Sequence, residues 1–190
     1  ARPGIRVPGT WDPFELGVRA ILGQQVSVKA ATTLSGRIVE RYGDKLEGAL
    51  AEAAAEFGLT HAFPTPARLK RAKLNNLGLV GARANTIRGF ARAAETGTVG
   101  FEAGQDDAEL AEALVDLPGI GDWTAQYILM RARKNPDAFP ASDLGLLRAF
   151  DRPDRPRMKP RELLARAEQW RPWRAYAALL LWSCPQNSGG

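Results

Sequence analysis

Apolar residues recur at intervals of three and four along most of the chain, a spacing typical of one face of an α-helix. The clearest case runs from Ser27 to Gly43, where the apolar positions are Val28, Ala31, Leu34, Ile38 and Tyr42. Asp12-Pro13-Phe14-Glu15 places an N-cap aspartate before a proline and a glutamate. This order predicts a helix that begins there and runs to about Leu22.

The same spacing predicts helices along the rest of the chain. They are expected over residues 46–57, from Thr65-Pro66 to about Ala72, over 82–95, 107–117 and 122–133, from Ser142 or Asp143 through Phe150, over 161–170, and from Pro172 to about Trp182. The two candidate strands, residues 5–7 and 98–101, are too short to build a sheet. The pattern therefore predicts an all-α domain of roughly eight to ten helices.

The composition is that of a globular chain with a small positive charge. With 190 residues, 45% of them apolar, the chain is long enough for one ordinary domain or two small lobes around a real core. The 26 Lys and Arg residues outnumber the 21 Asp and Glu residues, giving a formal charge of +5. This surplus weakly favours a polyanionic partner.

The cysteine content and the hydropathy of the chain exclude several classes of protein. Cys184 is the only cysteine, which excludes an intramolecular disulfide framework and cysteine-rich metal sites and indicates a reducing, cytoplasmic compartment. No apolar run reaches about eighteen residues and the N-terminus lacks the apolar core of a signal peptide, so neither a membrane nor export is expected. The chain begins without methionine. We interpret it as a processed form or as a domain of a longer protein.

The segment LPGIGDWTA, residues 117–125, joins two predicted helices. Gly119 and Gly121 permit positive φ and leave the backbone bare, so amides can point outward beside the N-terminus of the second helix. Such a nest of amides suits a phosphate oxygen. Carbonyls on the inner side of the turn are candidate ligands for a structural Na⁺ or K⁺ ion, namely those of Val115, Leu117 and Ile120.

Three other interpretations of this hairpin compete. A dinucleotide-binding turn needs a preceding strand and a third glycine, whereas here a helix precedes and Trp123 and Thr124 follow. A purely structural corner between two helices requires no ligand at all. A helix-turn-helix reader of the major groove needs a polar second helix, but QYILMRA is largely apolar. The nest therefore favours contact with a nucleic-acid backbone over base readout.

The hairpin and a second motif together resemble a known superfamily. LPGIGDWTA resembles the helix-hairpin-helix of the base-excision DNA glycosylases, and FPASD, residues 139–143, resembles their loop that carries the catalytic aspartate. The likeness to DNA-3-methyladenine glycosylase II of the AlkA type extends through RAILGQQVSVKAA, HAFPTPARL and RAEQWRPWRAYAALLLW. The resemblance implies two helical lobes with the active site in the cleft between them, and one catalytic domain over residues 1–190 with its hairpin at about 107–133. It also implies that the family's β-rich N-terminal domain is absent.

Asp143 is the candidate catalytic carboxylate. Local sequence alone favours an ordinary helix N-cap, and the resemblance implies the catalytic role. Hydrolysis of an N-glycosidic bond passes through an oxocarbenium-like sugar, which a nearby carboxylate stabilises while it orients or deprotonates a water. A base alkylated at a ring nitrogen leaves as a neutral molecule, so one carboxylate suffices. Bases of the 3-methyladenine and 7-methylguanine type are thus sensible substrates, and no cofactor is expected for catalysis.

Aromatic faces would hold such a cationic base by stacking and cation–π attraction. The resemblance places Trp123, Tyr127 and Trp182 in the base pocket, although plain core packing accounts equally well for Tyr127 and Trp182. Bifunctional relatives carry a lysine at the position of Trp123, and its amine forms a Schiff base with the sugar. Tryptophan cannot do this. We therefore expect a monofunctional hydrolase without lyase activity that leaves an abasic site.

The expected partner is double-stranded DNA containing alkylated bases, bound by a monomer. Gly119, Gly121 and the Thr124 hydroxyl are expected to contact its backbone. A flipped base leaves a gap that a wedge side chain fills. The resemblance puts the wedge at Gln25, where the compared family member has leucine, and Gln24 is a second candidate.

Several residues have simpler interpretations. His61 is expected to be a loop residue without a catalytic role. Arg131, Arg133 and Lys134 are interpreted as a solvated helix end, with phosphate contact as the alternative. Arg171, Trp173 and Arg174 fit a packed helix junction. Leu144 replaces a tyrosine of the compared sequence and removes one aromatic from the pocket rim.

Two rival functions remain open at this point. The first is a DNA-binding module that uses the hairpin without chemistry, such as an inactive fragment of a larger repair protein. The second is a mismatch or oxidised-purine glycosylase, which would need more polar pocket groups than the sequence offers.

Overall fold

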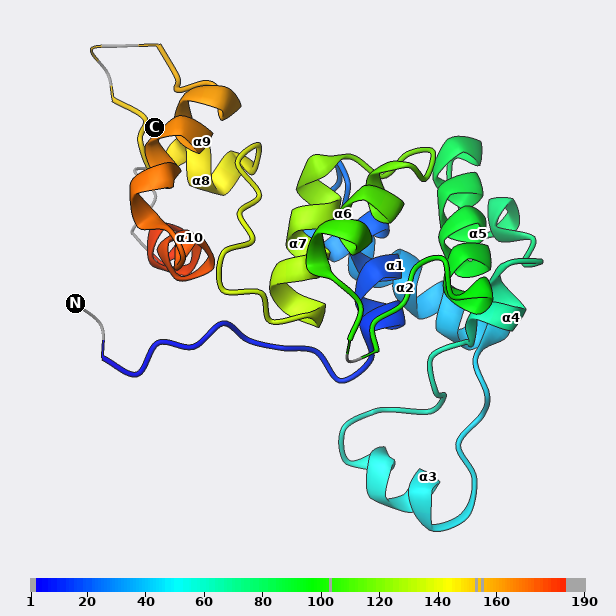
Figure 1. Cartoon of the computed structure of the whole chain (residues 1–190). Coiled ribbons are helices and arrows are strands. Elements are labelled where there is room, and N and C mark those ends of the chain that lie inside the picture. The colour runs from blue at the N-terminus through cyan, green and yellow to red at the C-terminus, as the bar shows by residue number, and fades with distance from the viewer. Residues whose placement is uncertain (1–2, 103, 153, 155, 184–190) are drawn as a thin grey trace. The chain divides into compact units, whose positions relative to one another are not determined.

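Every regular element among the described residues is a helix (Figure 1). The computed structural model describes residues 3–102, 104–152, 154 and 156–183, so Cys184 lies outside it. The predicted all-α class is confirmed. The chain divides into two compact units, which we call the α1–α5 unit (residues 14–100 and 116–119) and the α6–α10 unit (residues 1–13, 101–115 and 120–190).

The α1–α5 unit is built from five α-helices and one 3₁₀ helix. Their bounds are α1 (Pro13–Leu22), α2 (Val28–Tyr42), α3 (Gly48–Ala55), α4 (Pro66–Leu69), η1 (Leu74–Leu77) and α5 (Gly81–Thr96). The predicted start of α2 is confirmed, because the Ser27 side chain accepts a hydrogen bond from the Ala30 amide at 3.2 Å. Gly97, with φ of 77°, ends α5 in the left-handed conformation that glycine favours.

Aromatic and aliphatic side chains of α1 and α5 meet in the core of this unit. Phe14 stacks on Phe90 with ring centroids 5.5 Å apart. The fully buried side chains of the unit include Val18, Ile21, Leu22, Ile38, Leu69, Leu74 and Ile87. α3 stands apart from the other helices of its unit (Figure 1). A single antiparallel bridge between Lys45 and His61 joins the two arms that lead to it, so His61 is a loop residue as predicted.

The α6–α10 unit contains both helices of the hairpin and the last third of the chain. Its elements are α6 (Asp107–Val115), α7 (Asp122–Ala132), α8 (Leu144–Arg148), α9 (Pro160–Ala167), η2 (Glu168–Trp170) and α10 (Arg174–Trp182). Within this unit α6 packs against α7, and α10 packs against α8 and η2. The two helices of the hairpin therefore lie side by side, and α10 lies against the helix that begins after Asp143.

Arg133 ties the end of α7 to the segment before α6. Its Nε donates to Asp107 Oδ1 at 2.8 Å, and its Nη atoms donate to the carbonyls of Phe101, Glu102 and Gln105 at 2.8 to 3.2 Å. Its side chain is only 17% exposed. The interpretation of Arg133 as part of a solvated helix end is therefore wrong, because its guanidinium donates hydrogen bonds to internal carbonyls and to a carboxylate.

The packed helix junction suggested for Arg171, Trp173 and Arg174 holds for Arg174, whereas Trp173 is 58% exposed and the Arg171 side chain is half exposed. Arg174 is 9% exposed, and its Nε donates to both the carbonyl and the carboxylate of Asp137, at 3.0 and 2.9 Å. Glu168 pairs with Arg174 at 3.2 Å and with Arg171 at 2.7 Å. These pairs fix the start of α10 to the loop that precedes the FPASD segment.

Two helix predictions need correction at their ends. α10 begins at Arg174, two residues later than Pro172, with Trp173 at its N-cap in a non-helical conformation. α4 ends at Leu69, because Lys70 and the residues after it turn into η1, which the sequence did not predict. Thr65 precedes α4 but makes no side-chain cap hydrogen bond.

None of the helices in the described part of the chain combines the length and the apolar character that a membrane span requires.

Gly17 allows α1 to approach Phe90 closely. A Cβ at position 17 would lie 2.3 Å from Phe90 Cζ and 2.5 Å from Cε1, so the ring would have to move. We expect Gly17→Ala to lower the free energy of unfolding by about 1–3 kcal/mol, since overpacking outweighs the gain in helix propensity. Chemical denaturation of the variant and the wild type measures this loss.

Gly36→Ala is the matched control, because a Cβ at that position of α2 meets nothing within 4 Å. It is expected to stabilise the chain by up to about 1 kcal/mol. Equal stability of the two alanine variants would contradict the packing described for Gly17.

Candidate active site

Asp143 lies at the end of the FPASD segment and caps α8. Its backbone is extended, with φ of −65° and ψ of 125°, and its Oδ1 accepts a hydrogen bond from the Leu146 amide at 3.0 Å. The interpretation of Asp143 as an N-cap is therefore confirmed. This bond leaves Oδ2 and the second lone pair of Oδ1 available to other donors.

Two indole N–H groups fill these positions. Trp123 Nε1, from the first turn of α7, donates to Asp143 Oδ2 at 2.9 Å. Trp182 Nε1, from the last residue of α10, donates to Asp143 Oδ1 at 2.8 Å. Donors from three helices thus converge on one half-buried carboxylate and fix its orientation. The resemblance placed Trp123 and Trp182 in the base pocket, but nothing in the sequence predicted that both would hydrogen-bond to Asp143.

Tyr127 extends the aromatic surface on α7. Its ring stacks on Trp123 with centroids 5.3 Å apart and an interplanar angle of 9°. Arg131, one turn further on, donates from Nη1 to the Tyr127 hydroxyl at 3.1 Å and from Nε to the Pro8 carbonyl at 2.6 Å. Arg131 is therefore an internal contact rather than a solvated helix end. It holds Tyr127, and through the stack it supports Trp123.

Gly145 is a site residue that the sequence reasoning missed. A Cβ there would lie 3.0 Å from Asp143 Oδ1 and 3.1 Å from Trp182 Cδ1. Because glycine has no Cβ, the Trp182 indole can reach the Asp143 carboxylate across the first turn of α8. A glycine in the first turn of a short apolar helix, in DLGLL, was the available signal. Leu144 beside it is 59% exposed.

The hairpin turn at Pro118 and Gly119 packs within the α1–α5 unit. Gly119 has φ of 88°, and a Cβ there would lie 2.1 Å from Thr86 Oγ1. The Thr86 hydroxyl donates to the Pro118 carbonyl at 3.0 Å, and Gln24 Nε2 donates to the Gly119 carbonyl at 3.0 Å. Glycine is therefore required at position 119 both by its φ and by its close approach to α5.

Gly121 and Thr124 follow in the α6–α10 unit. Gly121 is the N-cap of α7 with φ of −100°, so of the two glycines only Gly119 adopts the positive φ that glycine permits. A Cβ at Gly121 meets nothing within 4 Å, so space is open there. The Thr124 side chain is only 2% exposed, which counts against the predicted contact between its hydroxyl and a phosphate.

The two glutamines differ in their settings. Gln24 contacts the hairpin turn as described, and its carbonyl accepts a hydrogen bond from Arg83 at 2.5 Å. Gln25 is exposed and has φ of 55°, a left-handed conformation that is uncommon for a residue with a side chain. Its role as a wedge stays a prediction.

The comparison with known proteins agrees with the resemblance that the hairpin and the FPASD segment carry. Residues 18–175 match the HhH-GPD family, described as "HhH-GPD superfamily base excision DNA repair protein". The chain belongs to this superfamily, as its motifs predicted.

Two curated relatives cover almost all of the chain. The chain is 40% identical over 185 residues to "DNA-3-methyladenine glycosylase 2" of Escherichia coli K12, covering 96% of this chain and 61% of the relative. It is also 40% identical over 181 residues to the "Probable bifunctional transcriptional activator/DNA repair enzyme AlkA" of Mycobacterium tuberculosis, covering 95% of this chain and 35% of that relative. The chain thus spans between about a third and three-fifths of the length of these relatives.

A solved structure supports the fold. The "3-methyladenine dna-glycosylase from Archaeoglobus fulgidus" superposes with a TM-score of 0.73 at 27% identity, covering 92% of this chain and 59% of that one.

The two hairpin glycines differ in whether their position tolerates a side chain. We expect Gly119→Ala to lower the free energy of unfolding by at least about 2 kcal/mol, because a left-handed alanine is strained and its Cβ strikes Thr86. Gly121→Ala should change it by less than about 0.5 kcal/mol, because the φ of residue 121 suits any residue and its surroundings are open. Urea denaturation of both variants tests this, and similar losses would disprove the assignment of the close approach to Gly119.

Proposed function

We propose that the chain is the catalytic part of a DNA glycosylase that hydrolyses the N-glycosidic bond of alkylated bases in duplex DNA. The observation that carries the proposal is the Asp143 carboxylate, held by donors from Trp123, Trp182 and the start of α8. The identity of 40% to a 3-methyladenine glycosylase supports the substrate class.

In this mechanism Asp143 stabilises the positive charge that develops on the sugar as the base leaves. A carboxylate that is already oriented needs no reorganisation during the reaction, and this preorganisation is a large part of electrostatic catalysis. The same group orients the water that attacks the anomeric carbon, and the product is an abasic site. Because an alkylated purine leaves as a neutral molecule, the mechanism needs no second carboxylate.

The two tryptophans would also receive the base. Their N–H groups are bound to Asp143, so the part left to contact a ligand is the aromatic face. Cation–π attraction to such a face contributes about 0.5–2 kcal/mol and favours a base that carries positive charge. Tyr127 stacks on Trp123 and so enlarges the aromatic surface.

DNA would be held at the hairpin by its backbone. The Thr124 and Ala125 amides donate to the Gly121 carbonyl, at 3.0 and 3.1 Å. The amides of Asp122 and Trp123, the first two of α7, are therefore the ones that would bind a phosphate, and the open space at Gly121 lets it approach them. The last carbonyls of α6 and those of the turn are neutral oxygen ligands, so Val115, Leu117 and Ile120 suit a structural Na⁺ or K⁺ ion by their chemistry. We further propose that the protein acts as a monomer in the cytoplasm.

Asp143→Asn tests the catalytic role. The amide can replace one carboxylate oxygen but presents N–H donors to an indole N–H on the other side, and it carries no charge. We expect release of methylated bases to fall by about 10²- to 10⁴-fold while duplex DNA is still bound. Single-turnover assays of free base from methylated DNA, with a binding assay alongside, measure both quantities.

Asp154→Asn, at an exposed position outside the site, is the control and should keep full activity. Full activity of Asp143→Asn would reject the mechanism. A wild-type chain that binds methylated DNA and releases no base would favour the non-catalytic module instead.

The lack of a lysine at position 123 leads to a second expectation. A lyase forms a Schiff base between its amine and the sugar, and Trp123 offers no amine. Borohydride added during turnover should therefore trap no covalent complex between the chain and DNA, whereas a glycosylase with lyase activity run in parallel should be trapped. A DNA adduct of this chain would overturn the monofunctional assignment.

A further inference from the structure

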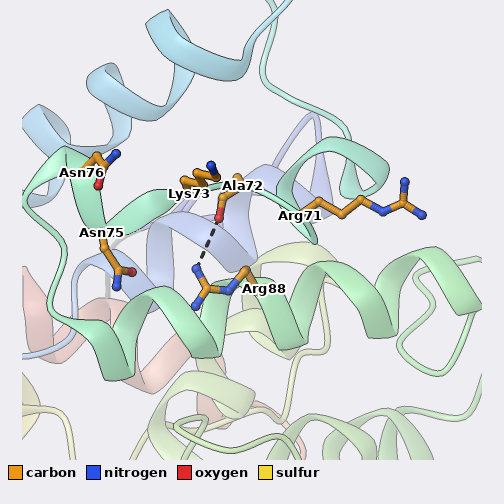
Figure 2. Close-up of a pocket in the computed structure, with 6 residues that line it drawn as sticks. All are labelled: Arg71, Ala72, Lys73, Asn75, Asn76 and Arg88. Atoms are coloured by element: carbon orange, nitrogen blue, oxygen red, sulfur yellow. Dashed lines mark hydrogen bonds between the residues drawn. The ribbon is translucent and has the colours of Figure 1, made fainter.

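Four cationic side chains gather on the surface of the α1–α5 unit. Three of them line a cavity of about 360 Å³ whose walls are Arg71, Ala72, Lys73, Asn75, Asn76 and Arg88 (Figure 2). Arg88 also lines a second cavity, of about 500 Å³, together with Arg92 on the next turn of α5. We call Arg71, Lys73, Arg88 and Arg92 the basic surface.

The positive charge of the basic surface is not neutralised internally. No acidic residue lines either cavity, and within the described part of the chain none of the four cations forms an ion pair. Glu95, in the last turn of α5, is paired with Lys70. Four uncompensated cations on one face create a positive potential that attracts a polyanion.

The chemistry of the walls fits phosphate groups rather than bases. Amide side chains accompany the cations, those of Asn75 and Asn76 in the first cavity and of Asn85 in the second, and no aromatic ring lines either cavity. The second cavity is also lined by Thr96 and Thr98 and by the apolar Ala93, Leu117 and Pro118. Stacking on a base therefore has no partner here. Guanidinium, ammonium and amide N–H groups all donate to phosphate oxygens.

Arg88 is the anchor of this surface. Its Nη1 donates to the Ala72 carbonyl at 3.2 Å (Figure 2), and its Nη2 donates to the Asn85 side-chain carbonyl. Arg88 lines both cavities, so these bonds hold its guanidinium where the two meet. A guanidinium has five donors, so it can still bind an anion. Gly89 follows it and lines the second cavity, and a Cβ there would meet nothing within 4 Å, so this stretch of helix is open to a ligand.

The second cavity also reaches the hairpin turn. Leu117 and Pro118 form part of its wall, and the Pro118 carbonyl is bonded to Thr86 on the same helix α5. The basic surface is thus continuous with the turn that is proposed to bind DNA. A strand that leaves the hairpin on this side would pass Arg92 and Arg88 before it reaches Lys73 and Arg71.

We propose that the basic surface is a second binding surface for the DNA backbone, which holds phosphates beyond the stretch gripped by the hairpin. This inference rests on the proposed function, since it takes duplex DNA as the partner. Its contribution is independent of base sequence and of damage, because phosphates carry no sequence information. The surface would increase affinity for intact DNA and help the protein to move along it.

Salt dependence of binding to an undamaged duplex tests the proposal. The variants are Arg88→Gln/Arg92→Gln on α5 and Arg71→Gln/Lys73→Gln on the segment before η1. Each lost phosphate contact should reduce the slope of log Kd against log salt by about 1 between about 50 and 200 mM salt. Each double variant should therefore lose about 2 in slope, with affinity at the lowest salt lower on the order of tenfold.

Arg161→Gln is the control for loss of a positive charge away from the basic surface. Arg161 is an exposed cation on α9, in the other unit, and should leave the slope almost unchanged. The Arg71 and Lys73 side chains are exposed, so their variant reports on the surface even if loss of Arg88 disturbs the fold.

Two outcomes would overturn the proposal. One is that both double variants bind with the slope of Arg161→Gln. The other is that the wild type does not bind an undamaged duplex at all. Release of methylated base by the wild type is measured separately. Active wild type with unaffected double variants would reject only the basic surface, whereas inactive wild type would reject the proposed function.

Discussion

The chemistry of the site depends on how one carboxylate meets three N–H donors. Asp143 sits at a helix start, where an amide is available to it, and two tryptophans from other helices direct their indoles at its remaining lone pairs. Hydrogen bonds to a charged group contribute roughly 1.5–3 kcal/mol each, and a donor or acceptor left unpaired costs a similar amount. Position and orientation of the carboxylate are therefore determined by the packing of α7, α8 and α10 together.

This arrangement explains residues that have no chemistry of their own. Gly145 clears the path between Trp182 and the carboxylate, and Arg131 secures the tyrosine that backs Trp123. The buried Arg174 fixes the first turn of the helix that ends in Trp182. These residues position the indoles of Trp123 and Trp182, so a substitution at any of them would act on the carboxylate by displacing an indole.

The helices could be predicted from local sequence signals, whereas the contacts of the site residues could not. The Ser27 cap and the Gly43 stop of α2 are local signals, and the structure follows both. The N-cap interpretation of Asp143 was also local, and it is correct together with the contacts to the tryptophans. Those contacts join residues 20 and 39 positions apart, so no local pattern could predict them. Arg133 was misassigned for the same reason, because its carbonyl acceptors come from a loop about thirty residues earlier.

Gln24 has a consequence for how mutational data on this protein would be interpreted. Its side-chain amide supports the carbonyl of Gly119 from within the same unit, next to the segment where a wedge is expected. A substitution there that weakened DNA binding would look like the loss of a side chain inserted into the duplex. The same defect would arise if the turn lost this support and its amides moved away from the phosphate that we propose they bind. Position 24 therefore reports on the shape of the turn, and a defect there does not by itself identify an intercalating residue.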